Sequence, residues 1–327
     1  MTSSAKPLRI LFAGTPQFAA IQLQVLLYGP HRVVGVLSRP DRPAGRGMKL
    51  EITPVAQCAR QHQLPLLQPS KLDADKPDNV LDQIQNLTPD LIVVAAYGAI
   101  FPPELLRIPK LGCVNLHASL LPRYRGATPI EQALIAGDES TGVTLMLMDE
   151  GLDTGHILAQ DRLNIRSSWD KNMLTLQLAW LSAKHLNNWL SKWQQGLLEP
   201  QPQNDQLASL TTQLHKSHAQ ADWREPASLL ARKVRAYSPA PCLWCYTRFK
   251  GRTKMQILKA RSIPIPAECT QLAPGQLFKL GKTLAVACGH QSALELLTFK
   301  LESGKTLRAL DALNAQMPGL TPGQILS

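Results

Sequence analysis

Short apolar runs alternate with stretches of helical spacing in the first 120 residues, and this alternation constrains the fold most strongly. The runs are Leu8 to Ala13, Val33 to Ser38, Asp90 to Ala96 and Leu111 to His117. Between them, stretches such as Pro16 to Tyr28 carry apolar residues near one helical face. Apolar runs of this length are typical of strands buried on both faces of a parallel sheet. We therefore expect a Rossmann-like α/β domain with a mostly parallel sheet.

The turn after the first of these runs lacks the fingerprint of a dinucleotide site. Gly14 to Ala19 reads GTPQFA and offers one Gly, whereas G-x-G-x-x-G needs three. A bound nucleotide cofactor is therefore not expected at this strand end.

Two polar side chains stand at the end of the run Leu111 to His117. Asn115 and His117 are separated by Leu116, so in a strand they point to the same face. Open α/β sheets place their chemistry beyond the carboxyl ends of their strands. Asp153 lies in DEGLDTGHI, a Gly-punctuated loop that can bring a carboxylate back to this point.

Asn115, His117 and Asp153 are residue types that together suit acyl-type chemistry. An amide donates to a developing oxyanion, an imidazole donates or moves a proton, and a carboxylate orients the imidazole or takes the proton itself. An Asn-x-His pair is also common in ordinary structural positions, so the pattern alone leaves both interpretations open.

The longer stretch around these residues resembles a known family. NLHASLLP, Asn115 to Pro122, and the following RYRGATPIEQALIAGDESTGVTLMLMDEGLDTGHI are similar to the folate-dependent formyltransferases. That family's signature is Asn-x-His-x-Ser-Leu-Leu-Pro with an Asp-Thr-Gly loop. GTPQFA and RPDRPAGRG, Arg39 to Gly47, resemble the branch that acts on methionyl-tRNA. The similarity covers nearly the whole chain and is weakest at Ser167 to Leu214 and after Gly281.

The resemblance implies a donor, an acceptor and a set of site residues. The donor is 10-formyltetrahydrofolate, used as a co-substrate without a metal, and the acceptor is the α-amine of initiator methionyl-tRNA. Asn115 and His117 are expected to stabilise the tetrahedral oxyanion, while Asp153 holds the His and helps to remove the amine proton. The folate site is expected to be lined by Ser119, Leu120, Leu121 and Pro122.

The basic residues Arg123 and Arg125 flank Tyr124 directly after this stretch. They are expected at the surface, either as solvated charges or as contacts to an anionic ligand. The residue types alone do not separate these two interpretations.

Arg39 to Lys49, RPDRPAGRGMK, is expected to be an irregular loop. It has closely spaced Pro and Gly residues, no periodicity, and four basic residues against one acid. A solvated surface loop and a finger that binds phosphates both fit this composition. The resemblance implies that the loop contacts the acceptor end of the tRNA through Arg42, Arg46 and Lys49.

The net charge of +11 is concentrated in the C-terminal part of the chain. Residues 1–200 carry 19 Lys and Arg against 17 Asp and Glu, whereas residues 201–327 carry 16 against 7. Residues 197–214 are polar and Pro-containing, which is typical of a linker. After them the pattern changes to five short strands and one helix, which favours a small OB-like β-barrel. We therefore predict domains at 1–196 and 215–327, joined by the linker 197–214.

The stretch from Pro226 to Ala267 contains no Asp or Glu. Its aromatic residues are expected mostly in the barrel core, and its charges either solvate the surface or bind nucleic acid. A run of 42 residues without an acid favours the second interpretation. The residues expected to bind tRNA are Arg232, Arg235, Arg248, Lys250, Arg252 and Lys254.

The remaining features exclude several classes of protein. No run of eighteen apolar residues is present, and the N-terminus passes into a strand without a signal-peptide pattern. The six Cys are scattered, and the pair Cys242 and Cys245 has no partner at zinc spacing, so both are expected to be strand residues in a reduced cytoplasm.

The expected function is thus formylation of initiator methionyl-tRNA by a cytoplasmic, monomeric enzyme. The alternatives are a formyltransferase with a small amine such as glycinamide ribonucleotide or a sugar nucleotide as acceptor, a formyl-folate hydrolase, and a non-catalytic RNA-binding module. The basic C-terminal part argues against the small acceptors and the hydrolase.

Overall fold

The structure is a computed structural model that describes residues 6–44, 49–72, 80–302 and 304–327. The chain divides into two units. The first comprises Met1–Pro129, Ser140–Asn164 and Thr175–Thr212, and the second comprises Ile130–Glu139, Ile165–Leu174 and Gln213–Ser327.

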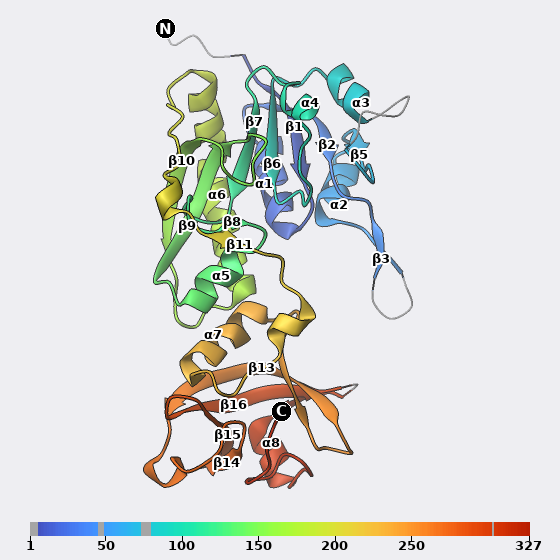
Figure 1. The fold of residues 1–327 in the computed structure, drawn as a ribbon. Helices are drawn as coiled ribbons and strands as arrows, with labels where there is room; N and C mark the ends of the chain where they lie inside the picture. The colour runs from blue at the N-terminus through green and yellow to red at the C-terminus, as the bar shows by residue number, and fades with distance from the viewer. Residues whose placement is uncertain (1–5, 45–48, 73–79, 303) are drawn as a thin grey trace. The chain divides into compact units, whose positions relative to one another are not determined.

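The first unit is built on a seven-stranded sheet, which confirms the predicted α/β class (Figure 1). The strand order is β10-β9-β7-β6-β1-β2-β5. All pairs from β7 to β5 are parallel, whereas β9 pairs antiparallel with both β7 and β10. The strands are β1 (Arg9–Gly14), β2 (Arg32–Leu37), β5 (Leu66–Leu67), β6 (Leu91–Ala95), β7 (Cys113–His117), β9 (Ser140–Leu147) and β10 (Ile157–Asn164).

The burial of each strand follows its place in this sheet. All five residues of the central strand β6 are buried, since helices cover both faces. In the edge strand β10, buried or partly buried residues alternate with exposed ones. β9 and β10 form an antiparallel hairpin around the loop that carries Asp153.

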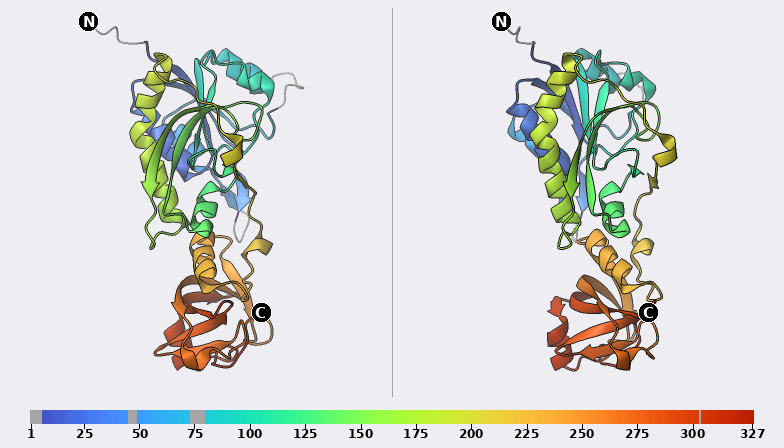
Figure 2. Two further views of the ribbon diagram at one scale, coloured as in Figure 1. Left: turned by 60° about the vertical axis from the view of Figure 1, so that its left-hand side comes forward. Right: turned by 90° about the vertical axis from the view of Figure 1, so that its left-hand side faces the viewer.

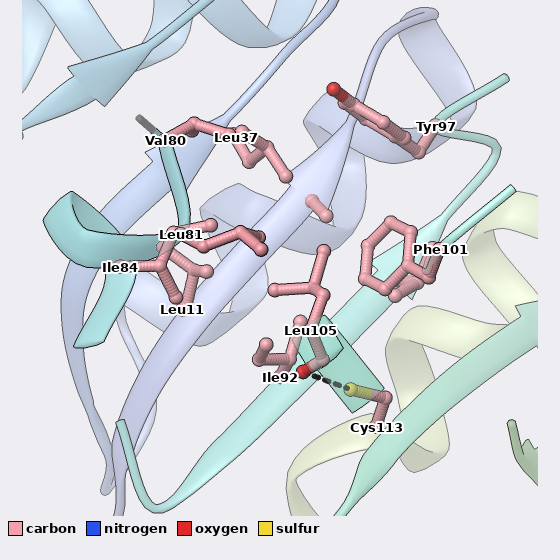
Figure 3. Packing of buried hydrophobic residues seen from close by; sticks show 12 residues of the cluster. Leu11, Leu37, Val80, Leu81, Ile84, Ile92, Tyr97, Phe101, Leu105 and Cys113 are labelled. Atoms are coloured by element: carbon pink, nitrogen blue, oxygen red, sulfur yellow. Dashed lines mark hydrogen bonds between the residues drawn. The ribbon is translucent and has the colours of Figure 1, made fainter. Parts of the chain in front are cut away.

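Helices pack on both faces of the sheet. They are α1 (Gln17–Leu27), α2 (Pro54–Gln61), α3 (Val80–Asn86), α4 (Pro103–Leu106) and α6 (Lys171–Gln194). The buried Gln22 of α1 donates to the carbonyl of Ala179, so α1 and α6 lie together on one face (Figure 2). On the other face, α3 and α4 pack on β1 and β6, with Ile84 and Leu105 fully buried among Leu11 and Ile92 (Figure 3).

Helix α2 begins with a side-chain cap. The Thr53 hydroxyl accepts a hydrogen bond from the Ala56 N–H at 3.2 Å, and Pro54 occupies the first helical position. The cap satisfies one of the free N–H groups at the start of the helix. Pro54 has no N–H, so it leaves no unsatisfied donor at the first position.

The expectation of an irregular loop at Arg39 to Lys49 is wrong for Arg42–Ala44 and for Lys49, which lie in strands. Arg42–Ala44 forms β3, which pairs antiparallel with β4, Lys49–Glu51. Asp41 anchors this hairpin, because its carboxylate accepts from the Thr53 N–H and from the Arg60 guanidinium at 2.7 Å. Long-range bonds of this kind have no local sequence signal, so the composition suggested a loop. Arg46 lies outside the described residues.

Part of the predicted linker is bonded into the first unit. β11, Leu210–Thr211, pairs parallel with β8, Arg125–Gly126, which directly follows the Asn-x-His stretch. A Cβ at Gly126 would lie 2.4 Å from the Thr211 carbonyl oxygen, so this approach requires glycine. The 3-10 turn η1, Asp205–Leu207, precedes β11.

The second unit carries an antiparallel sheet, as predicted. Its described strands pair in the open order β12-β13-β16-β15-β14, with β17 beside β16, so the expected closed barrel is not seen among them. The strands are β12 (Leu243–Thr247), β13 (Thr253–Pro264), β14 (Leu277–Leu280), β15 (Thr283–Cys288), β16 (Ser292–Leu301) and β17 (Thr306–Arg308).

Helix α7 packs against β13 and β16 of that sheet. The helical segments of this part of the chain are α5 (Pro129–Ala136), α7 (Ala227–Tyr237), α8 (Ala309–Asn314) and the short turns η2 (Lys216–Ala219) and η3 (Ala267–Cys269). The expectation of a single helix after the linker is wrong, because α8 is only six residues long and has too few turns for a helical period.

Helices long and apolar enough to cross a bilayer are absent from the part of the chain that the structure describes. Among the same residues, no cluster of three or more His, Cys, Asp or Glu side chains has the geometry of a metal site. Cys242 and Cys245 are buried, and burial raises the pKa of the Cys245 thiol.

The core around α4 can be tested with a matched pair of truncations. Leu105→Ala is expected to lower the free energy of unfolding of the α/β unit by about 2–5 kcal/mol, because it leaves a cavity where neighbours cannot fully collapse. Ile100→Ala removes an apolar side chain that is 77% exposed, so its effect should stay within about 0.5 kcal/mol. Urea denaturation measures both, and equal effects would contradict the packing described here.

Candidate active site

The three residues predicted to do chemistry meet at one strand end. Asn115 and His117 lie at the carboxyl end of β7, between the neighbouring strands β6 and β9. Asp153 lies in the turn between β9 and β10, and its carboxylate reaches both side chains. Residues 38 positions apart in the chain are thus brought within hydrogen-bond range.

The Asp153 carboxylate has contacts on both oxygens. Oδ1 accepts from the Asn115 Nδ2 at 3.3 Å, and Oδ2 accepts from the Gly126 N–H at 2.8 Å. The His117 Nδ1 lies 3.5 Å from Oδ2. The side chains of Asp153 and His117 are only 14% and 6% exposed, so little water screens this pair.

The position of the His117 proton follows from its partners. The Nε2 atom lies 2.9 Å from the Tyr124 carbonyl oxygen, which can only accept, so Nε2 carries a hydrogen. In a neutral ring the Nδ1 atom then presents a lone pair to the Asp153 carboxylate. Nδ1 is therefore the ring nitrogen that can accept a proton, and it lies beside the Asp153 carboxylate.

The Asp153 backbone is in the left-handed region, with φ of 55°. This conformation costs free energy for a residue other than glycine, and it persists only where surrounding contacts enforce it. Here it turns the carboxylate toward β7, and the Gln203 side-chain amide donates to the Asp153 and Gly155 carbonyls.

The four residues expected to line the folate site form the turn after β7. Ser119 and Leu121 are buried, and the Ser119 hydroxyl donates to the Arg123 carbonyl at 2.6 Å. The Thr144 hydroxyl bridges the turn, donating to the Ser119 carbonyl and accepting from the Leu121 N–H. Leu120 and Pro122 are partly exposed.

Two residues of the hairpin β3–β4 were predicted to bind tRNA. Arg42 is exposed, and no ion pair involving it is found in the described part of the chain. Its neighbour Asp41 forms its ion pair with Arg60, at 2.7 Å. Lys49 is the first residue of β4.

Three of the predicted basic residues of the second unit lie over aromatic rings. Arg252 is 3.8 Å from the Tyr246 ring centre, Lys254 is 4.0 Å from Trp244, and Lys250 is 5.6 Å from Phe249. Trp244 is largely buried, so its ring serves the core and the cation together. We call these three cations the row: Lys250 and Arg252 lie, with exposed Arg248, in the turn that connects β12 and β13, and Lys254 lies on β13.

The other two predicted basic residues of this unit are bonded to backbone carbonyls. The Arg232 Nε donates to the Ile135 carbonyl, and the Arg235 guanidinium donates to the Trp169 carbonyl. Burial, and then the nearby charge of Arg232, lowers the pKa of Arg235. Arg232 and Arg235 therefore hold other segments of this unit through hydrogen bonds to backbone carbonyls, whereas the cations of the row lie over aromatic rings.

Comparison with known proteins extends these observations to the whole chain. The model of the family described as "Formyl transferase" matches residues 8–188, and that described as "Formyl transferase, C-terminal domain" matches residues 213–317. The methionyl-tRNA formyltransferase of Pseudomonas fluorescens (strain SBW25) is 43% identical over 322 residues, 98% of each chain. That of Pseudoalteromonas translucida (strain TAC 125) is 40% identical over 325 residues, again 98% of each.

The chain belongs to the methionyl-tRNA formyltransferase family. The resemblance expected from NLHASLLP and the Asp-Thr-Gly loop is thereby confirmed. The match covers both units, so it does not rest on the catalytic stretch alone.

Solved structures share the fold of this family member at low identity. An N-formyltransferase from Helicobacter canadensis, solved with folinic acid and dTDP-3-aminofucose, has a TM-score of 0.63 and 14% identity, over 88% of this chain and 98% of that one. HypX from Aquifex aeolicus, solved with tetrahydrofolic acid, has a TM-score of 0.60 and 15% identity, over 97% and 49%.

Sequence reasoning missed several residues that hold this candidate site together. Arg125 was expected at the surface, but its guanidinium is buried and bonded to Gln203 and Asp205. Gln203 and Thr144 were not singled out at all. Their partners lie 16 to 80 residues away in the chain, so no spacing rule reveals them.

Proposed function

We propose that the chain transfers the formyl group of 10-formyltetrahydrofolate to the α-amine of methionyl-tRNA, with the initiator tRNA as its acceptor, in the cytoplasm. The observation that carries the proposal is the meeting of Asn115, His117 and Asp153 at one strand end. Family membership over 98% of the chain supports the choice of reaction.

In this proposal, Asn115 and His117 bind the oxyanion that forms when the amine attacks the formyl carbon. One N–H of the Asn115 amide is directed to Asp153, which fixes the amide plane and leaves the second N–H for a substrate oxygen. A preorganised donor of this kind contributes about 3 kcal/mol to transition-state stabilisation. His117 lies beside Asn115 at the end of β7 and is the second group proposed to contact this oxygen.

The His117–Asp153 pair also handles the proton that the amine loses. As the new N–C bond forms, the proton leaves the amine for this pair, and the bond from the formyl carbon to the folate nitrogen then breaks. The pair can return a proton to that nitrogen, so the charge of the site is restored. The low exposure of His117 and Asp153 keeps water from competing as the nucleophile.

The folate site is proposed to include the turn Ser119 to Pro122. The Ser119 carbonyl and the Leu121 N–H are already hydrogen-bonded to the Thr144 hydroxyl. The partly exposed side chains of Leu120 and Pro122 supply apolar surface for a flat ring. Apolar walls with few polar groups are typical of sites for such ligands.

Two basic surfaces are proposed to bind tRNA phosphates. One is the β3–β4 hairpin, through Arg42, with Arg46 and Lys49 assigned by sequence only. The other is the row Lys250, Arg252 and Lys254 with the adjacent Arg248, to which Arg232 and Arg235 add charge. Phosphate contacts of this kind bind with little sequence preference and weaken as salt rises.

A single assay compares this function with the alternatives. The purified chain is given 10-formyltetrahydrofolate with initiator methionyl-tRNA, elongator methionyl-tRNA, glycinamide ribonucleotide, a dTDP-amino sugar or water alone. Consumption of the donor is expected only with methionyl-tRNA and fastest with the initiator. Faster consumption with a small acceptor or with water would replace the proposal, and none with any acceptor would favour a binding module.

Replacing the site residues tests the catalytic roles. Asn115→Ala, His117→Ala and Asp153→Ala are each expected to lower turnover by about a hundredfold or more, because each removes a donor or the proton acceptor from the transition state. The affinity for tRNA should change much less. Normal turnover in any one variant would remove that residue from the mechanism.

Replacing Arg42 tests the role of the β3–β4 hairpin. Arg42→Ala is expected to slow formylation of initiator methionyl-tRNA by about tenfold, since one charge-assisted phosphate contact contributes on the order of 1.5 kcal/mol. Any slow hydrolysis of the donor should be unaffected, because that reaction needs no tRNA. Single-turnover formylation and donor hydrolysis are measured on the same preparation.

The control for Arg42 is Arg107→Ala, which removes an arginine of the same unit whose side chain is 74% exposed. Formylation should stay normal in this control. Arg252→Ala, in the row of the second unit, should weaken tRNA binding and lower the slope of log affinity against log salt by about one. Equal rates for the Arg42 and Arg107 variants would show that the hairpin is only a connector.

A further inference from the structure

A single glutamine on the segment after α6 is bonded to the loop that carries Asp153. The Gln203 Nε2 donates to the Asp153 carbonyl at 2.8 Å and to the Gly155 carbonyl at 2.7 Å. It therefore contacts both sides of the turn in which Asp153 adopts its left-handed conformation. Gln203 itself is partly buried and lies fifty residues further along the chain.

The orientation of the Gln203 amide is determined by its partners. Its Oε1 accepts from the Arg125 Nε at 2.9 Å, and an arginine can only donate. The two carbonyls of the turn can only accept, so the Nε2 must face them. Arg125 thus turns the amide so that both of its hydrogens point at the Asp153 turn.

Arg125 is itself held in place. Its guanidinium is 7% exposed and is bonded to the Asp205 carboxylate at 2.8 Å, while its backbone pairs with β11. The next residue, Gly126, donates its N–H to the Asp153 carboxylate at 2.8 Å. The same short segment therefore holds the Asp153 carboxylate directly and, through Gln203, the Asp153 backbone.

We propose that Gln203 is a positioning residue for formyl transfer: it holds the strained Asp153 turn so that the carboxylate stays on Asn115 and His117. The inference rests on the proposed catalytic role of Asp153. A residue in the left-handed region relaxes when the contacts around it are lost. A shift of about 1 Å in a catalytic group is enough to lower a rate by about a hundredfold.

The chain offers replacements that separate the hydrogen bonds from the bulk of the side chain. Gln203→Glu keeps the length and the acceptor for Arg125, but it sets an oxygen against the two carbonyls. Gln203→Ala removes all of these bonds. Gln201→Ala is the matched control, since Gln201 lies two residues earlier on the same segment and is exposed.

The measurements are turnover and KM for both substrates, together with the melting temperature of each variant. Gln203→Ala and Gln203→Glu are expected to lower kcat by about 10- to 100-fold. KM for 10-formyltetrahydrofolate should change by less than about threefold, because Gln203 acts on the transition state through Asp153. Gln201→Ala should match the unaltered enzyme. A normal kcat in both Gln203 variants would overturn the proposal.

A double replacement distinguishes positioning from general support of the fold. If Gln203 acts only through the Asp153 carboxylate, adding Gln203→Ala to Asp153→Ala should cost less than about twofold in kcat. A full additional loss in the double variant would show a structural effect and overturn the proposal. The unaltered enzyme serves as the reference for function: if it fails to formylate methionyl-tRNA, the proposed function fails, whatever the Gln203 variants show.

Discussion

The contact of the Asp153 carboxylate with the end of β7 is the interaction on which the site depends. It joins an amide and an imidazole from the sheet to a backbone N–H from the following segment, in a place with little water. Weak screening makes each of these interactions stronger than at the surface, and it makes any unpaired group there costly. The Asp153 carboxylate is therefore the centre of the hydrogen-bond network, and its oxygens need hydrogen-bond donors from the surrounding residues.

The fold prepares this contact in two steps. In the parallel part of the sheet, the carboxyl end of β7 lies beside that of β6. β9 pairs antiparallel with both β7 and β10, so the turn between β9 and β10 lies near the carboxyl end of β7. The turn then takes a left-handed conformation at Asp153, which costs free energy for a residue other than glycine. Gln203 and Gly126 supply the contacts that make it tolerable, so local strain is balanced by bonds from distant segments.

The basic surfaces proposed to bind tRNA follow a different rule. In the β12–β13 hairpin, Arg252 lies over the Tyr246 ring and Lys254 over the Trp244 ring. The same pair of strands therefore positions both the aromatic rings and the basic side chains. Arg232 and Arg235 show that a basic residue in the right stretch is not automatically a phosphate contact, since both are bonded to carbonyls. Counting charges along the sequence identifies the basic stretch. Only the structure distinguishes the basic residues that are bonded to backbone carbonyls from those that lie over aromatic rings.

The sequence by itself determined the alternation that makes the sheet, the cap of α2, and the presence of Asn115, His117 and Asp153, because periodicity, capping and motif spacing are local properties. It also carried enough similarity to indicate the family. Tertiary structure decided the β3–β4 hairpin, the open strand order of the second sheet, and the hydrogen bond between Arg125 and Gln203. Each of these depends on hydrogen bonds whose free energy appears only once the folded backbone has brought the partners together.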